Sequence, residues 1–498
     1  MSNLYQRFQQ HVSTDKPLLI SDQGKTLASY QDLDEKSGQY AHTLKHLGLK
    51  PGDRVAAQIE KSPEALYLYC ACLRSGLIYL PLNTAYGHQE LDHFLSDAGA
   101  TLLVVEPSKT SEHRHREVKV VSLGEHSSGS LSSLAAASPS DPNIEPRTEN
   151  DIAVIIYTSG TTGLPKGAMI SHGNLISNGE TLLKAWGWSA EDVLLHTLPV
   201  FHVHGLFVGL HLPLLAGTPI LFHSSFSTKT VLAALPSATV FMGVPTYYTR
   251  LLNDGIDQQS SANMRLFISG SAPLLATTFS AWEQTTGKII LERYGMSETG
   301  MNISNPLTGE RRAGTVGLPL PGVECRIVDE KGLAVASDTP GDLWVKGANV
   351  FSGYWNNPDK TAESFTEEGF FITGDIASID PDGYISIVGR SKDLIISGGL
   401  NIYPKELELL LDKFEPVSES AVIGLPHPDF GEAVCAVIVL KPNALPDADE
   451  IQNYMRQQVA NFKVPKAVFF TDQLPRNSMS KVQKNLLRDQ HQDTFIAP

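Results

Sequence analysis

Tyr157-Thr-Ser-Gly-Thr-Thr-Gly-Leu-Pro-Lys-Gly167 follows directly on the apolar run Ile152-Ala-Val-Ile-Ile156. Glycines let backbone N–H groups line a concave loop, hydroxyls donate hydrogen bonds to phosphate oxygens, and a lysine supplies positive charge. The stretch differs from the common nucleotide-binding loop, because Pro165 stands before Lys166 where that loop needs glycine. A flexible linker of Gly, Ser and Thr fits less well, because the stretch directly follows a strand-like run and contains a proline. We therefore predict a polyphosphate-binding loop.

The composition of the chain limits its class and its partners. With 498 residues, 42% hydrophobic and 19% charged, it fits a globular protein with about three domain-sized units. A net charge of -15 argues against a nucleic-acid partner, since no basic excess neutralises phosphates. The N-terminal residues lack signal and transit features, and the longest apolar stretch, 199–222, is interrupted by histidines and prolines. We expect a cytoplasmic protein with no membrane partner and with its four cysteines reduced.

Alternating strand and helix patterns predict an α/β fold with parallel-rich sheets up to about residue 315. The expected strands are 54–59, 101–105, 152–156, 193–196, 219–222, 239–242 and 265–269, and the expected helices are 62–73, 174–186 and 204–215. Residues 127–147 are rich in Ser, Ala and Pro and are expected to be a surface linker.

The pattern changes after about residue 315. Strand-turn-strand signals at 323–328, 341–346 and 383–388 predict a β-rich subdomain over about 315–390. Expected strands at 420–423 and 433–439 and helices at 405–412 and 448–459 indicate a small α+β domain. We therefore expect a large domain over 1–390 and a small one over 391–498.

Four further motifs carry residues suited to nucleotide chemistry. Glu298 in Tyr294-Gly-Met-Ser-Glu-Thr299 is a carboxylate suited to holding Mg²⁺ near a phosphate loop. Asp375 suits the two hydroxyls of a ribose, Arg390 follows a strand, and Lys481 lies on a Pro/Ser loop. Taken singly, Asp375, Arg390 and Lys481 each fit an ordinary turn or surface residue. Their occurrence together, in this order, favours a shared site.

Together these motifs resemble the adenylate-forming superfamily of acyl-CoA synthetases, non-ribosomal adenylation domains and luciferases, over about residues 20–490. Within it, the chain is similar to malonyl-CoA synthetases. The segments that carry this closer likeness are His202-Val-His-Gly-Leu-Phe207, Phe267-Ile-Ser-Gly-Ser-Ala-Pro273, Leu291-Glu-Arg-Tyr-Gly-Met296 with Met301-Asn302, Asn461-Phe-Lys-Val-Pro-Lys466 and Pro475-Arg-Asn477. Ser297 departs from the threonine more common in the family but keeps the hydroxyl.

The resemblance implies a two-step ligase. ATP and a carboxylate first give an acyl-adenylate and pyrophosphate, and the thiol of coenzyme A then displaces AMP. It implies ATP, Mg²⁺, coenzyme A and malonate as cofactors and small-molecule partners, in a monomer or small homo-oligomer. It also implies a small mobile domain that rotates about a hinge at Lys392 between the two steps.

The resemblance also assigns residues to roles. The catalytic residues are Lys481, Glu298 and Thr158, and the last two are the metal ligands. The phosphate-binding residues are Thr158, Ser159, Gly160, Thr161, Thr162, Gly163 and Lys166. The remaining nucleotide-binding residues are Ser269, Gly270, Ser271, Ala272, Pro273, Glu292, Tyr294, Gly295, Met296, Ser297, Asp375 and Arg390, and those beside the pantetheine arm are Ser397, Gly398 and Gly399. The acid-binding residues are His204, Ser269, Arg293, Met301 and Asn302.

Arg293 discriminates best between acids. A fatty-acid pocket would avoid it, because an unpaired buried guanidinium is unfavourable, whereas a second carboxylate on the substrate would pair with it. Its structural alternative is a salt bridge with Glu292 or Glu180. His202 and His204 lack a third ligand and are not a persuasive metal pair.

Several alternatives to a malonate–CoA ligase stay open. One is a ligase for methylmalonate, or for a small aliphatic or aromatic acid. Others are a nucleotide-binding regulator, a carrier-loading protein or an oxidative luciferase. The first two of these lack support, because Lys481 and Glu298 are both present and no carrier domain follows residue 490. The apolar substrate of a luciferase suits Arg293 poorly.

Overall fold

The nine-stranded sheet of the computed structural model explains how distant motifs meet. The structure describes residues 2–11, 15–113, 116–158, 165–397, 400–477 and 481–495. The chain divides into two compact units, one of residues 1–324 with 345–371 and the other of residues 325–344 with 372–498. The domain boundary expected near residue 390 stays a prediction.

The first unit contains two large sheets. The nine-stranded sheet has the order β15 (Leu318–Pro319), β14 (Gly300–Ser304), β13 (Leu291–Met296), β12 (Leu266–Ser269), β11 (Val240–Gly243), β9 (Leu194–His196), β10 (Ile220–Phe222), β1 (Pro17–Ile20) and β2 (Thr26–Ser29). The six-stranded sheet has the order β6 (Lys119–Ser122), β5 (Leu102–Val105), β3 (Arg54–Gln58), β4 (Ile78–Pro81), β7 (Ile152–Thr158) and β8 (Lys166–Ser171). The α/β fold with parallel-rich sheets is therefore confirmed.

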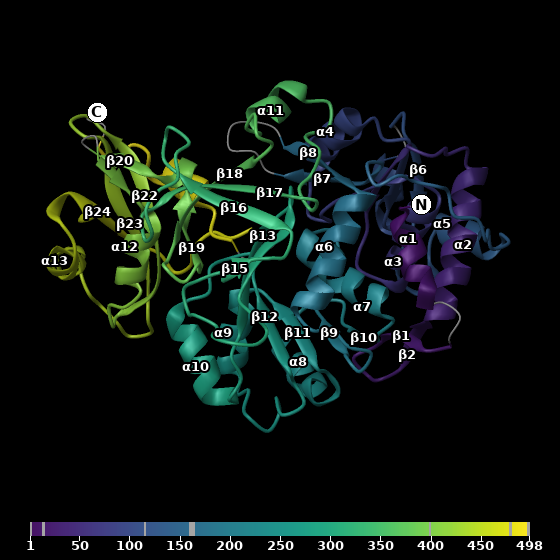
Figure 1. Ribbon diagram of the computed structural model, residues 1–498, viewed down its shortest axis with the longest axis horizontal. Coiled ribbons are helices and arrows are strands. Elements are labelled where there is room, and N and C mark those ends of the chain that lie inside the picture. Colours follow the sequence, from purple (N-terminus) through teal and green to yellow (C-terminus); the bar gives the residue numbers. More distant parts are fainter. Residues whose placement is uncertain are drawn as a thin grey trace. The chain divides into compact units, whose positions relative to one another are not determined.

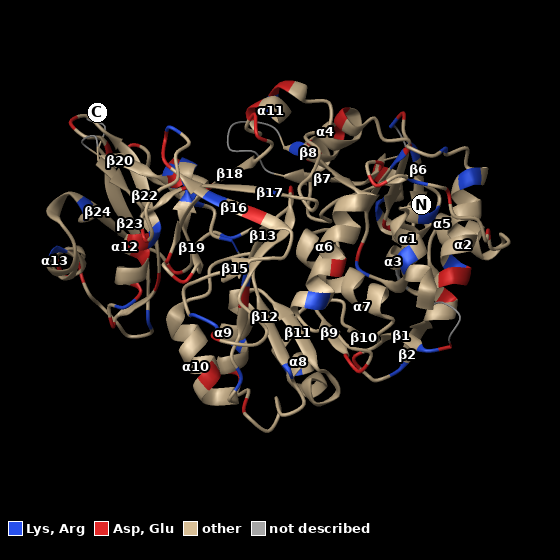
Figure 2. Cartoon of the chain, viewed as in Figure 1, with Lys and Arg blue, Asp and Glu red and all other residues tan. Residues whose placement is uncertain are grey.

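The central strands are parallel and apolar. Strands β13, β12, β11, β9, β10 and β1 pair in parallel in that order. Strands β9 to β12 carry no Asp, Glu, Lys or Arg (Figure 2), as expected for a sheet covered on both faces. Helices α8, α9 and α10 lie beside β11 and β12 (Figure 1), where Phe241, Tyr248, Phe267 and Trp282 pack in one core.

The helices of this unit are α1 (Leu4–Phe8), α2 (Tyr30–His46), α3 (Pro63–Arg74), α4 (His88–Ala98), α5 (Ser130–Ala136), α6 (His172–Ala185), α7 (His211–Ala216), α8 (Thr228–Ala234), α9 (Pro245–Asn253), α10 (Ala276–Thr286) and α11 (Pro358–Glu363). Local signals explain their starts. Ser62 caps α3 ahead of Pro63, and Ser171 forms a capping box with Asn174 at the start of α6. The helix expected at 204–215 is a π-helix, His204–Leu210, continued by α7.

One local prediction is wrong, and one strand was not predicted. The expected linker at 127–147 contains helix α5, because Leu131 and Ala135 at i, i+4 spacing are buried and Ala favours helix. The strand that was not predicted is β8, which follows the phosphate loop and precedes α6. The pairs Tyr157–Gly167 and Thr158–Lys166 make β7 and β8 an antiparallel hairpin, which the Gly and Ala of β8 concealed.

The second unit is rich in strands. Most of a four-stranded sheet, in the order β16 (Val323–Val328), β17 (Gly341–Gly347), β18 (Phe371–Ile379) and β19 (Ile385–Arg390), lies within it. A five-stranded sheet contains β21 (Leu400–Ile402), β20 (Ile395–Ser397), β23 (Gly431–Leu440), β22 (Val417–His427) and β24 (Ala467–Phe470). Its helices are α12 (Pro404–Leu411), α13 (Ala448–Gln458) and α14 (Lys484–His491). Ile402, Leu407, Ile438 and Ile451 belong to its core.

Candidate active site

The β7–β8 hairpin places the two ends of the predicted phosphate loop side by side. Thr158 ends β7 and Lys166 begins β8, and the two residues are register partners. Ser159, Gly160, Thr161, Thr162 and Gly163 lie outside the described residues, so the phosphate cradle itself stays a prediction. A hairpin fixes the distance between its ends, and it therefore holds Thr158 and Lys166 at one site.

Glu298 joins the same site from the nine-stranded sheet. It lies in the turn between β13 and β14, and it is buried. Its Oε1 accepts hydrogen bonds from the Thr158 hydroxyl and from the Tyr354 hydroxyl, each at 3.2 Å. The backbone N–H of Phe351 donates to the Glu298 carbonyl at 2.8 Å. The structure thus brings together Thr158 and Glu298, the two predicted metal ligands.

Tyr354 is a site residue that the sequence analysis missed. Its hydroxyl contacts Glu298, and the Lys166 ammonium lies 5.9 Å from its ring centroid. Burial and the neighbouring Glu298 charge raise the pKa of Tyr354, so its hydroxyl stays protonated and donates. The only sequence signal was the aromatic pair Tyr354-Trp355 after a glycine.

Helix α4 supports the hairpin from outside. His93 Nε2 donates to the Pro165 carbonyl at 2.9 Å, and the Tyr157 hydroxyl donates to Asp97 at 2.7 Å. Trp355 links the same parts, because its ring N–H donates to the Asp97 carbonyl and its backbone N–H to the Gly167 carbonyl. The residues flanking the predicted loop are therefore held on both sides.

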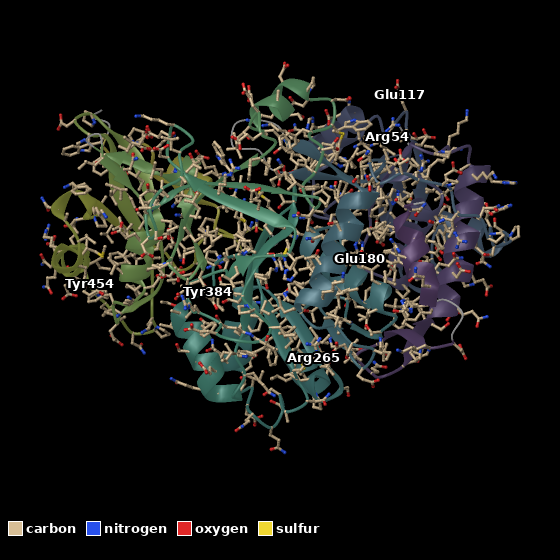
Figure 3. The ribbon with its side chains drawn as sticks, in the orientation of Figure 1. Arg54, Glu117, Glu180, Arg265, Tyr384 and Tyr454 are labelled. Atoms are coloured by element: carbon tan, nitrogen blue, oxygen red, sulfur yellow. The ribbon has the colours of Figure 1, made fainter. Side chains whose placement is uncertain are left out.

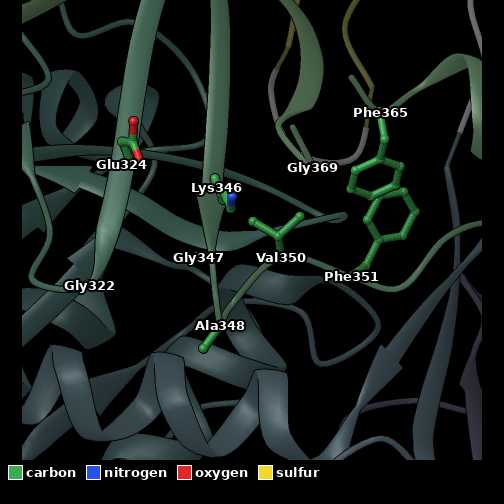
Figure 4. A pocket seen from close by; sticks show the side chains of 9 residues that line it. All are labelled: Gly322, Glu324, Lys346, Gly347, Ala348, Val350, Phe351, Phe365 and Gly369. Atoms are coloured by element: carbon green, nitrogen blue, oxygen red, sulfur yellow. The ribbon is translucent and has the colours of Figure 1, made fainter. Parts of the chain in front are cut away.

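A surface pocket with a volume of about 530 Å³ opens next to Phe351 (Figure 4). Phe351 and Phe365 stack along one wall, 5.7 Å between centroids, and the Lys346 ammonium donates to the Glu368 carbonyl at 2.8 Å. None of the predicted site residues lines this pocket. We therefore do not assign this pocket to the candidate active site.

A second polar cluster surrounds Arg293 on β13. His204 begins the π-helix, Ser269 ends β12, and Ser271 follows in the next loop with a φ of +71°. The Ser271 hydroxyl lies 3.2 Å from His204 Nδ1. A side chain at Gly270 would come within 2.4 Å of the guanidinium carbon, so only glycine admits Arg293 here. Five of the predicted substrate and nucleotide residues thus meet.

The Arg293 cluster contains buried polar atoms that no described residue satisfies. They are Arg293 Nε and Nη2, His204 Nε2 and Ser269 Oγ. Arg293 is 3% exposed and makes no ion pair with a described carboxylate. Burial lowers its pKa to about 10, and burial with the Arg293 charge lowers the pKa of His204, which is therefore neutral at pH 7. A charged arginine beside a neutral histidine suits an anion.

Glu180 and Glu292, the two carboxylates named above as salt-bridge partners for Arg293, contact other residues. Glu180 on α6 is labelled in Figure 3, and its Oε1 lies 3.7 Å from Arg7 Nη2 in a pair of partly exposed side chains. Glu292 Oε1 accepts from the Leu274 N–H at 3.0 Å. Among the described residues, neither of these two carboxylates forms an ion pair with Arg293.

The other predicted residues of the first unit lie on or near the same strands. Ala272 and Pro273 follow Ser271, and Tyr294, Gly295 and Met296 lie on β13, with Ser297 in the turn. Met301 and Asn302 are buried on β14. The Asn302 amide donates to Thr299 at 2.7 Å and accepts from Asn349 at 2.9 Å. His202 precedes the π-helix, and the backbone N–H of His204 donates to its Nδ1.

The second unit holds the remaining predicted residues. Asp375 and Arg390 are register partners on β18 and β19, and Arg390 Nε lies 2.6 Å from Asp375 Oδ1. Lys392 is exposed in a 3-10 turn, Ser397 ends β20, and Lys481 is exposed with its backbone N–H on Asn477. Gly398 and Gly399 lie outside the described residues. Asp375 and Arg390 therefore act as a pair.

No group of three His, Cys, Asp or Glu side chains is placed to hold a metal ion within the described ranges. In the same ranges, every helix is too short or too polar to cross a lipid bilayer.

The chain matches known families over most of its length. The family described as AMP-binding enzyme matches residues 6–355, and the AMP-binding enzyme C-terminal domain matches residues 406–481. A structure of ATP-bound MatB from Rhodopseudomonas palustris is 47% identical, covers 99% of both chains and superposes with a TM-score of 0.96.

Two curated relatives have names that refer to different acids. A malonate–CoA ligase of Arabidopsis thaliana is 35% identical over 92% of this chain and 81% of its own. A feruloyl-CoA synthase of an Amycolatopsis species is also 35% identical, over 93% of this chain and 94% of its own. Overall identity therefore does not select the acid, and the pocket residues must be considered instead.

Proposed function

We propose malonate as the acid activated by this chain, which belongs to the AMP-binding enzyme family and is an AMP-forming CoA ligase. In the proposed reaction, ATP and malonate give malonyl-adenylate and pyrophosphate. The thiol of coenzyme A then attacks the acyl carbon, and AMP leaves. The thiol proton is lost as the thioester bond forms.

This proposal rests mainly on the two N–H groups of Arg293, at Nε and Nη2, that no described residue accepts. Nε and Nη2 project their hydrogens in one direction, with the spacing of the two oxygens of a carboxylate. Both atoms are buried and lack a partner among the described residues. An uncompensated buried cation is unfavourable, so a substrate carboxylate at this edge supplies the missing interaction. A monocarboxylate consumes its only carboxylate in the reaction and has none left for Arg293.

His204 and Ser269 extend the same pocket. Neutral His204 has one nitrogen beside Ser271 and the other, Nε2, without a described partner. With Ser269 Oγ it offers a second pair of polar atoms around a small anion. These groups favour a short polar acid over a fatty acid, whose chain would leave them buried and unsatisfied.

The ATP end of the site is proposed around Glu298. Mg²⁺ prefers oxygen ligands, and the Glu298 carboxylate with the Thr158 hydroxyl supplies this donor set. A bound Mg²⁺ would neutralise phosphate charge. Lys166 adds a cation beside Tyr354, and positioned charges of this kind supply most of the catalysis when two anions must meet.

Residues of the second unit complete the proposal. The paired Asp375 and Arg390 would hold the ribose, with the aspartate accepting from its hydroxyls. Lys481 would neutralise the carboxylate and the α-phosphate during adenylation. Rotation about Lys392 would then exchange Lys481 for the Ser397-Gly398-Gly399 segment and the pantetheine arm.

A substrate panel tests the acid. Pyrophosphate release is measured with malonate, methylmalonate, succinate, acetate and octanoate, each with and without coenzyme A. We expect the highest kcat/KM with malonate. A higher kcat/KM with acetate or octanoate than with malonate would contradict the role of Arg293. Preference for methylmalonate or succinate would keep the dicarboxylate site and change the acid.

A second experiment tests the division of the reaction between steps. We expect Lys481→Ala to abolish pyrophosphate release while the variant still converts supplied malonyl-adenylate and coenzyme A to the thioester. Lys484, which pairs with Glu408, offers a matched control for a lysine change nearby. Equal loss of both steps in Lys481→Ala would contradict the hinged arrangement.

A further inference from the structure

Lys61 is a buried lysine that the proposed reaction does not use. It lies between β3 and α3 with 6% exposure, and no described carboxylate lies within ion-pair distance. Its three donor positions meet three acceptors, namely His196 Nδ1 at 2.7 Å, the His196 carbonyl at 3.0 Å and the His223 carbonyl at 2.5 Å. Burial lowers its pKa well below the usual range. A methionine would fill the same space without this desolvation.

The direction of the hydrogen bonds around His196 follows from its other neighbour. His196 Nε2 lies 2.9 Å from the Gly205 carbonyl, which can only accept. Nε2 therefore carries the ring proton, and Nδ1 can act only as an acceptor, here for an N–H of Lys61. Burial lowers the pKa of His196, which keeps the ring in this single-proton form. The result is a directed chain, Lys61 to His196 to Gly205.

This chain ends at the backbone that carries His204. Gly205 follows His204 in the π-helix, a rare form that is frequent at functional sites. The His196 ring packs directly on this helix, because a side chain at Gly209 would lie 2.5 Å from His196 Nε2. His196 thus holds the π-helix at its first turn, one residue from the histidine that faces Arg293.

We propose that Lys61 and His196 are positioning residues for the acid site, which fix the Gly205 carbonyl and through it the placement of His204. The proposal rests on the proposed function, which places the acid beside Arg293 and His204 and identifies it as malonate. Neither residue touches substrate in this account. Their effect is on the affinity for the acid and not on the binding of ATP.

Two substitutions of His196 separate the bond to Gly205 from the rest of the ring. In His196→Gln, the amide nitrogen takes the place of Nε2 and still donates to the Gly205 carbonyl. In His196→Asn, the shorter side chain keeps an acceptor for Lys61 but does not reach Gly205. We expect His196→Asn to raise the malonate KM about tenfold and His196→Gln to stay within about threefold of the wild type, with the ATP KM unchanged in both.

Hydrogen exchange gives a readout that needs no substrate. In the ligand-free protein, backbone exchange over residues 204–210 should accelerate in His196→Asn and remain near wild type in His196→Gln. Lys61→Met, which removes the donor to Nδ1 and keeps the ring, should accelerate the same peptide and raise the malonate KM. If His196→Asn does not fold, Lys61→Met against the control below carries the test.

Tyr69→Phe is the matched control. It removes a buried hydrogen bond of 2.8 Å to His211, the residue that follows the π-helix, and leaves Gly205 untouched. Its malonate KM should equal that of the wild type. The proposal is overturned if Tyr69→Phe raises the malonate KM as much as Lys61→Met, if the Gln and Asn variants behave alike, or if the ATP KM rises equally. A panel that selects another acid would overturn the proposed function alone, because the exchange pattern would be unchanged.

Discussion

Arg293 and Glu298 lie five residues apart on one β-hairpin, yet their surroundings differ in hydrogen bonding. The Glu298 carboxylate oxygen Oε1 accepts from Thr158 and Tyr354, so its region is stable before any ligand arrives. Arg293 presents two N–H groups that no described residue accepts. The two regions therefore differ in what a ligand changes. At the phosphate side, formed by Glu298, Thr158 and Tyr354, a ligand exchanges existing contacts for new ones. At the acid side, formed by Arg293, His204 and Ser269, polar atoms stay unsatisfied until the acid binds.

The largest expected effect concerns the phosphate side. Glu298→Gln keeps the shape and the hydrogen-bond acceptor but removes the negative charge proposed to hold Mg²⁺. We expect the rate of adenylate formation to fall about 100- to 1000-fold, with the malonate KM within about threefold of wild type. Pyrophosphate release measures the rate, and Glu180→Gln at the surface pair with Arg7 is the control. A loss of less than about tenfold would remove Glu298 from the phosphate side.

The next effect concerns the neutral histidines near the acid side. Burial lowers the pKa of His211 to about 3, and the pKa values of His204 and His196 shift in the same direction. Below pH 6.5 the unfolded chain binds protons that the folded chain excludes. The free energy of unfolding therefore decreases as the pH is lowered. The loss is about 1.4 kcal/mol per pH unit for His211, until the pH reaches its folded pKa.

Urea unfolding between pH 7.5 and 5 measures this loss. The midpoint should stay constant above pH 7 and fall steadily below pH 6.5, and His211→Asn should reduce the slope. A midpoint that rises on acidification would show that these histidines take up protons in the folded chain.

A smaller effect tests Tyr354. Tyr354→Phe removes one donor to Glu298 and keeps the ring beside Lys166. Loss of one hydrogen bond to a charged group, about 1.5 kcal/mol, should raise the ATP KM about tenfold and leave the malonate KM unchanged. Tyr40→Phe, which removes a buried hydroxyl contact with Ser132, is the control. Equal changes in both KM values would mean that the two sides are not separate.

The smallest expected effect is that of Ser269→Ala, which should weaken malonate binding without destabilising the free protein. Ser269 Oγ is buried without a described partner, so Ser269→Ala should leave the free energy of unfolding unchanged or raise it by up to about 1 kcal/mol. The malonate KM should rise about two- to fivefold. Thermal unfolding and malonate saturation measure the two quantities. A clear loss of stability would show that the hydroxyl is satisfied in the free protein.

The sequence predicted the alternating strands and the polar motifs better than the contacts between them. Val154, Ile155 and Ile156 indicated a buried strand because β-branched residues favour strands. Strand β8 was missed because its Gly and Ala give no such signal and its pairing with β7 is a tertiary property. Helix α5 was missed because three of its first four residues are serines, which are typical of turns and caps, and only Leu131 and Ala135 of its apolar residues are buried.

The candidate site shows the same division. Motifs identified Glu298 and Arg293, since carboxylates and guanidinium groups have few uses near a phosphate loop. Tyr354 and Lys61 were missed because tyrosine and lysine are common, and only their contacts across the fold distinguish them. The surroundings of Arg293 also required the structure, because burial and unsatisfied atoms cannot be read from spacing.

Arg293→Met is the sharpest test of the acid site, because methionine fills similar volume without charge. We expect the malonate KM to rise at least tenfold, the ATP KM to stay within about twofold of wild type, and the thermal stability of the free protein to equal or exceed that of the wild type. A malonate KM within about threefold of wild type, or a marked loss of stability in the free protein, would show that Arg293 does not bind the acid.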